Sequence, residues 1–217
     1  MKRTLTIPSE LSEITLKQHQ RLLEIDEPTN EQLVSIFCNI STEEVLQLPN
    51  NVYDKAVQTL DKLTEKFNDK HELQMRFELN GTQYGMIPNL DEISYGENKD
   101  LTKYLGDWKT MHLAMAVLYR PVEDRLGKTY SIEKYNGTRE HREVMQHMPL
   151  EVVLGAQLFF YRLTEDLLKA IPNYLERALN NNLKEDQQTQ EESTKLTGEA
   201  MMKCIASLRE TLGDLTK

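Results

Sequence analysis

Apolar residues recur at intervals of three or four along most of the first 67 residues, which is the spacing of one helical face. Segment 51–67 shows it most clearly, with Val52, Ala56, Leu60, Leu63 and Phe67. Capping residues precede three shorter segments: Thr15 before 16–25, Thr29 with Gln32, and Ser41 with Glu44. A Ser or Thr followed three residues later by Gln or Glu pairs with free backbone N–H groups at a helix start. We therefore expect four short helices here, after a short strand at residues 3–7.

The pattern changes to strict alternation between residues 73 and 79, where apolar and polar side chains take turns. This spacing of two is typical of a strand with one buried face. Asn80-Gly81 suits both left-handed positions of a two-residue turn, so a β-hairpin is predicted at about 73–87. A two-stranded sheet is marginal alone. The hairpin must lie on the helices or gain a third strand, and residues 3–7 and 128–135 are both candidates.

Helical spacing returns after the hairpin. A helix is expected around 96–105, and a strongly apolar one runs from Trp108 to its stop at Pro121. Its apolar stripe is predicted to form the centre of the core and contains Trp108, Met111, Met115 and Leu118. The following segment is expected to be loop, short strand and loop, and residues 138–147 a polar helix. The longest helix should run from Pro149 to about Leu179, with Pro172 kinking or dividing it.

The composition changes sharply after residue 180. Residues 181–195 are strongly polar, and an amphipathic helix is predicted at 196–217. The predicted fold is therefore α+β and predominantly α-helical, with a domain at 1–180 that contains the hairpin, a linker at 181–195 and a C-terminal helix. That helix either folds back on the domain or docks on a partner. Its candidate partner-binding residues are Leu196, Met201, Ile205, Leu208 and Leu212.

Charge and cysteine content narrow the class of protein. The net charge of −9 disfavours nucleic-acid binding, because an acidic surface repels phosphates. Two distant cysteines, Cys38 and Cys204, make no disulfide framework or CxxC pair, so a reducing compartment is expected. The N-terminus lacks a signal-peptide pattern, and no segment approaches the roughly 20 apolar residues of a membrane span. We expect a soluble intracellular protein.

Candidate chemistry is sparse. His141 and His147 are six residues apart, which places them on different helix faces and disfavours a helical metal pair. His112 is expected to be hydrogen-bonded and partly buried, whereas His19 and His71 lie in polar contexts. The phosphate-binding and nucleophile-elbow motifs are absent from the sequence. We expect no metal, no cofactor and no catalytic site.

A few other residues allow two interpretations each. The adjacent carboxylates Asp91-Glu92 and Glu123-Asp124 resemble those of two-metal nucleases, but such pairs are common among 35 acidic residues. Cys38 lies in an apolar run and is expected to be a packing thiol. Arg120 either caps the carbonyl groups at the end of the core helix or contacts a partner.

Two stretches carry a resemblance to a known class of protein. These are "ITLKQHQRLLEI" with the following "LVSIFCNISTEEVLQLP", and "GMIPNLDEISYGE", which leads into a Trp-containing helix ending in "YRP". They resemble small helical proteins of tailed-bacteriophage structural modules, and the resemblance covers about residues 12–175. It lies in pattern and in no catalytic motif.

The resemblance implies virion morphogenesis by protein–protein binding, without catalysis, as a tail-assembly chaperone or a minor head or tail component. The implied partners are other phage structural proteins, with a homo-oligomer also open, and neither membrane nor nucleic acid is expected. The implied location is the host cytoplasm during assembly, or the virion. The alternative is a phage-encoded intracellular enzyme or regulator, such as a metal-dependent hydrolase.

Overall fold

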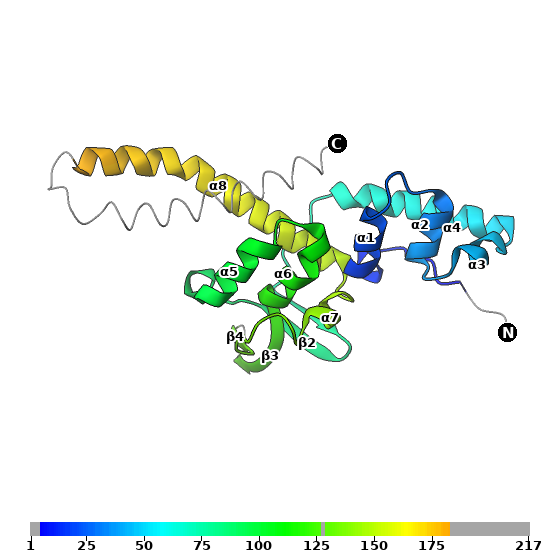
Figure 1. Cartoon of the computed structure of the whole chain (residues 1–217), viewed down its shortest axis with the longest axis horizontal. Coiled ribbons are helices and arrows are strands. Elements are labelled where there is room, and N and C mark those ends of the chain that lie inside the picture. The colour runs from blue at the N-terminus through cyan, green and yellow to red at the C-terminus, as the bar shows by residue number, and fades with distance from the viewer. Residues whose placement is uncertain (1–4, 127–128, 183–217) are drawn as a thin grey trace.

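Helices predominate around one four-stranded antiparallel sheet, which confirms the predicted α+β class (Figure 1). The computed structural model describes residues 5–126 and 129–182. The first predicted strand, at residues 3–7, does not form in its described part, since residues 5–7 are in irregular structure. The five C-terminal candidate residues between Leu196 and Leu212 lie outside the described residues.

The first third of the chain forms the four predicted helices. They are α1 (Leu16–Leu23), α2 (Asn30–Phe37), α3 (Thr42–Leu46) and α4 (Asn50–Glu65). Short 3₁₀ turns at Leu11–Glu13 and Lys66–Asn68 precede and follow them. Each of the three predicted helix starts at Thr15, Thr29 and Ser41 forms a reciprocal capping box with the residue three positions later. The sequence thus determines these helix starts by local hydrogen bonding.

The predicted hairpin consists of β1 (Arg76–Leu79) and β2 (Thr82–Met86). Asn80 and Gly81 have φ of 52° and 77°, so both occupy the left-handed region that a two-residue turn of this kind requires. Phe77 stacks on Tyr84 across the pair, with ring centroids 5.6 Å apart. These observations confirm both the turn and its position.

The third strand comes from neither expected segment. It is β3 (Tyr119–Leu126), which pairs with β2, and β4 (Thr129–Ile132) pairs with β3 to give the order β1-β2-β3-β4. The prediction that Tyr119 and Arg120 end a helix before a loop was therefore wrong. Pro121 explains the difference, because a residue before proline is driven from helical to extended backbone. Segment 128–135 does contribute a strand, as the fourth.

The remaining helices are α5 (Tyr95–Tyr104), α6 (Met111–Leu118), α7 (Arg142–Met145) and α8 (Leu150–Asn182). The 3₁₀ turns Leu90–Glu92 and Trp108–Thr110 precede α5 and α6. Met111, Met115 and Leu118 of α6 are fully buried, which confirms this helix as the centre of the core. The polar helix expected at 138–147 is shorter than predicted. Helix α8 passes Pro172 undivided and reaches Asn182, the last residue that the structure describes.

Among the side chains of helix α8 that the structure describes, those of its first turns pack on the body. Val152, Val153 and Ala156 are buried there. A Cβ at Gly155 would lie 2.3 Å from the carbonyl oxygen of Glu72, so the absence of a side chain allows this close approach. Farther along, the helix leaves the body and extends away from the sheet (Figure 1).

Helix α1 joins the N-terminal helices to the rest of the fold. The N–H groups of Leu16 and Lys17 donate to the carbonyl oxygens of Met148 and Gln146, at 2.9 and 2.8 Å. His19 is buried, with its ring edge-on to Phe67 and Trp108 at centroid distances of 5.3 and 4.6 Å. The prediction that His19 lies in polar surroundings was wrong. Phe67 and Trp108 are distant from it in sequence, so its sequence neighbours did not indicate these contacts. Burial lowers the pKa of His19 to about 4.

This burial predicts acid sensitivity at the junction. Above pH 6.5 the ring is neutral in both the folded and the unfolded chain, so it adds no pH dependence. Between pH 6.5 and 4 the unfolded chain binds the proton first, which lowers the free energy of unfolding by up to about 3 kcal/mol. The stability of His19→Leu should therefore fall less between pH 7.5 and 4.5, as measured by urea denaturation. An equal fall in both proteins would contradict this account.

Candidate functional site

Charged side chains gather at two places beside β3, and the first is a buried ion pair. Arg120 Nη2 lies 2.6 Å from Glu97 Oε1, and the two side chains are only 6% and 9% exposed. Arg120 Nη1 donates to the carbonyl oxygen of Val117 at 3.1 Å, at the end of α6. The pair therefore ties α5, the end of α6 and the start of β3 together.

Local sequence places Glu97 for this contact. Ser94 caps α5, and its backbone N–H donates to Glu97 Oε2 at 2.7 Å, while Glu97 N donates to Ser94 Oγ at 3.3 Å. Burial by itself raises the pKa of Glu97, but the hydrogen bonds from Ser94 and Arg120 outweigh it and hold the pKa below its usual value. Glu97 is thus held ionised, as a partner for the buried guanidinium.

Tyr135 extends this network to the segment after β4. The Arg120 guanidinium lies over its ring, 5.4 Å from the centroid, and its hydroxyl donates to Asp100 Oδ2 in α5. Burial, followed by the Asp100 carboxylate, raises the pKa of Tyr135. The four side chains link three elements that the sequence separates by up to 38 positions, from Glu97 to Tyr135.

Arg120 is the one candidate partner-binding residue that the structure describes. Its bond to Val117 supports the capping interpretation, whereas its burial, with 5% of the residue exposed, leaves no surface for a partner. We therefore correct its assignment from partner contact to internal network. Glu97 and Arg120 also belong to the motifs that carry the phage resemblance, so these two residues of the pattern serve the fold.

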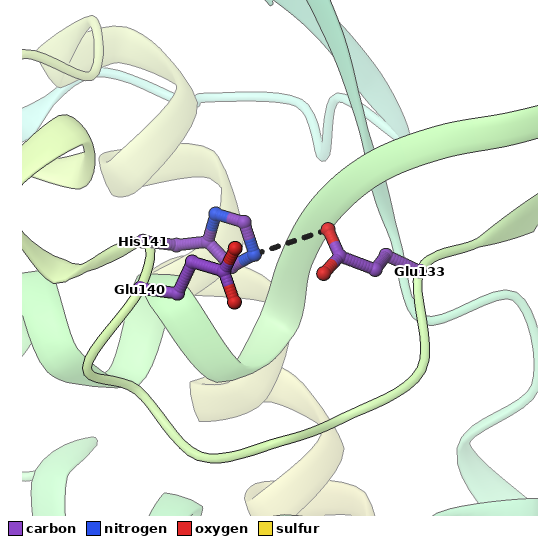
Figure 2. A group of neighbouring side chains, drawn as sticks. All are labelled: Glu133, Glu140 and His141. Carbon is purple, nitrogen blue, oxygen red and sulfur yellow. Dashed lines mark ion pairs between the residues drawn. The ribbon is translucent and has the colours of Figure 1, made fainter.

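The second cluster consists of Glu133, Glu140 and His141, in the segment between β4 and α7 (Figure 2). His141 Nε2 lies 3.2 Å from Glu133 Oε2, and one potential ligand atom from each residue lies within 4.8 Å of the others. Figure 2 shows the Glu140 carboxylate beside the imidazole ring. The side chains of His141 and Glu133 are 12% and 32% exposed, and Glu140 is exposed. One nitrogen and two carboxylate groups thus converge.

Neighbouring elements hold two members of the cluster in place. The Glu133 N–H donates to the carbonyl oxygen of Pro121 in β3 at 2.9 Å. The Tyr84 ring of β2 packs edge-on to His141 at a centroid distance of 6.4 Å. Burial, followed by the charge of Glu133, raises the pKa of Tyr84, so the carboxylate acts on this ring electrostatically. An open hollow beside Glu140 is lined by Asn136, Gly137, Thr138, Arg139 and Arg142.

Sequence reasoning missed this cluster. It compared His141 with His147, whereas the nearby groups are Glu140 and Glu133, the latter eight positions away across a loop with no periodic pattern.

The predictions for His112 and Cys38 are confirmed. His112 is partly buried, with Nδ1 3.2 Å from Gln20 Nε2. Cys38 is buried, and burial raises its pKa to about 11, as expected of a packing thiol.

The adjacent acidic pairs separate into different places. Asp91 and Glu92 lie in the 3₁₀ turn before α5, and Glu123 and Asp124 lie in β3, and all four residues are exposed. The one group of three or more potential metal ligands found among the described residues contains none of them.

The chain was compared with protein families, curated proteins and solved structures. No family model, curated protein or solved structure matches the chain. Among the helices that the structure describes, none is both long enough and apolar enough to cross a membrane.

The buried pair predicts a large difference between two arginine variants. Arg120→Met should lower the free energy of unfolding by about 3 kcal/mol or more, because it leaves the Glu97 carboxylate buried without its partner. Arg142→Met is the matched control, since its pair with Glu143 is about half exposed and should contribute less than about 1 kcal/mol. Urea denaturation at pH 7 measures both. Similar losses in the two variants would contradict the structural role of Arg120.

Proposed function

We propose that this chain is a non-catalytic protein of tailed-bacteriophage particle assembly that acts by binding other phage structural proteins. It serves either as a tail-assembly chaperone or as a minor component of the head or tail. The resemblance of residues 12–175 supplies the phage context. The observation that supports binding as the mode of action is the form of α8.

Helix α8 continues beyond the turns whose described side chains are buried against the body. Its 33 residues span about 50 Å at 1.5 Å per residue. The buried side chains of its described part end at Ala156, Phe159 and Phe160 are partly buried, and Leu163 is 38% exposed. A helix with one end anchored and the other extending from the body is suited to packing against a second protein.

The internal network is consistent with such a role. The buried contacts of Arg120 with Glu97 and Tyr135 fix the body from which α8 extends. An anchored, rigid body lowers the entropic cost of presenting a binding helix. A chaperone would use this helix to cover a segment of a tail protein until assembly, whereas a particle component would keep the contact. A multi-copy component would also form symmetric contacts between copies.

A second candidate function has its own observation. An intracellular enzyme or regulator, such as a metal-dependent hydrolase, is favoured by the convergence of Glu133, Glu140 and His141. Imidazole and carboxylate groups with open positions between them are used by catalytic metal sites. Hydrolysis that is lost with chelator and regained with metal would favour this candidate over the first.

Quantitative mass spectrometry of purified particles, from the phage that encodes the chain, tests the first proposal. The chain is expected at a fixed ratio to the major capsid protein if it is a structural component. A chaperone should be absent from particles and present in infected-cell lysate in complex with a tail protein. A chain found only in lysate, and free of every phage structural protein, would contradict the proposal and favour the enzyme.

A further inference from the structure

We propose that Glu133, Glu140 and His141 bind one divalent transition-metal ion, with Zn²⁺ as the best fit. The ion would bridge the segment after β4 to the start of α7. This inference does not depend on the phage assignment, because it follows from the geometry of three side chains. It also differs from the hydrolase alternative, since a bridging ion needs no substrate.

The distances allow a common centre for the three ligand atoms. Atoms no more than 4.8 Å apart all lie within about 2.8 Å of one point, and zinc bonds to nitrogen and oxygen measure roughly 2.0–2.2 Å. The exposed Glu140 side chain has the freedom to rotate and shorten its distance. His141 Nε2 and Glu133 Oε2 are already 3.2 Å apart, which is the order of separation of two ligands on one zinc ion.

The donor set selects the class of ion. An imidazole nitrogen favours Zn²⁺ and other transition metals over Mg²⁺ and Ca²⁺, which prefer oxygen ligands alone. The two carboxylates supply two negative charges that balance a divalent ion. Three protein ligands leave at least one position for water, so the site would be partly hydrated.

The histidine distinguishes this group from a cluster of exposed acids. The His141 side chain is 12% exposed, lies against the Tyr84 ring and directs Nε2 toward Glu133 (Figure 2). The backbone of Glu133 is tied to Pro121, so both inner ligands are positioned by the sheet. Glu140 would complete the site from the solvent side. Preorganised ligands of this kind need little rearrangement to bind an ion.

Two arginines lie near the site, and one of them is paired with a carboxylate. Arg142 lies on the hollow beside Glu140, and its Nε is 3.3 Å from Glu143 Oε1. Arg139 also lines this hollow. An ion bound to both Glu133 and His141 would restrain Tyr135, which lies between them in the sequence and packs on Arg120. Metal binding should therefore stabilise the folded chain as a whole.

Titration of the untagged, chelator-treated full chain with Zn²⁺ tests the site. Isothermal titration calorimetry should give one ion per chain, and the midpoint of thermal unfolding should rise with Zn²⁺. Mn²⁺ should bind more weakly, in line with the general order of metal affinities, and Ca²⁺ should not compete at equal concentration. His141→Ala and Glu140→Gln should each weaken Zn²⁺ binding at least about tenfold.

Two further variants keep the result interpretable. His147→Ala, six residues along the chain, should leave Zn²⁺ affinity unchanged. Glu140→Gln alters an exposed side chain, so its effect on binding can be measured even if a change at the buried His141 disturbs folding. Absence of Zn²⁺ binding by the unaltered chain would overturn the proposal. So would Zn²⁺ affinity that is the same in Glu140→Gln and the unaltered chain.

Discussion

The buried guanidinium of Arg120 is the contact on which the body of this fold depends. It lies where α6 ends and β3 begins, and it is in contact with Val117, Glu97 and Tyr135 at the same time. A charge with so little exposure is tolerated only when it is paired, because its desolvation cost is large. The helix α5, the sheet and the segment after β4 are thereby held in one arrangement, and the apolar core around α6 closes against them.

A second set of contacts joins the N-terminal helices to this body. Backbone hydrogen bonds from Leu16 and Lys17 reach the segment before α8, and His19 packs between Phe67 and Trp108. Helix α8 begins at the same place, so its base is fixed by both halves of the chain. This explains how a 33-residue helix can extend from the body while its first turns stay packed on it.

Local chemistry explains which elements the sequence predicts. The helix starts at Thr15, Thr29 and Ser41 and the Asn80-Gly81 turn depend on neighbours within four positions, and each forms as expected. Strand β3 was missed because its first residues continue the apolar helix pattern, and only the sheet and Pro121 decide otherwise. The burial of His19 depends on how distant segments pack, and the approach of Glu133 to His141 depends on the path of the loop between them, so neither could be predicted.

The structure thus contains a body held by buried contacts, a helix that extends from it, and a group of three potential metal ligands. The proposed partner surface on α8 and the proposed cation site near α7 are different surfaces, so either proposal can hold without the other. A result on partner binding therefore leaves the metal proposal untouched, and a result on metal binding leaves the partner proposal untouched. The resemblance to phage structural modules bears on partner binding alone. Two residues of its motifs, Glu97 and Arg120, form the buried ion pair of the body.

Site-specific photo-crosslinking in phage-infected cells tests the central claim, binding through α8, most directly. A photoreactive amino acid at Leu163, which is 38% exposed in α8, should cross-link to a phage structural protein or to a second copy of the chain. The same group at Glu43, exposed in α3, is the control and should give a different or weaker pattern. Cross-links from Leu163 that match those from Glu43, or none to any phage structural protein or second copy, would contradict the account.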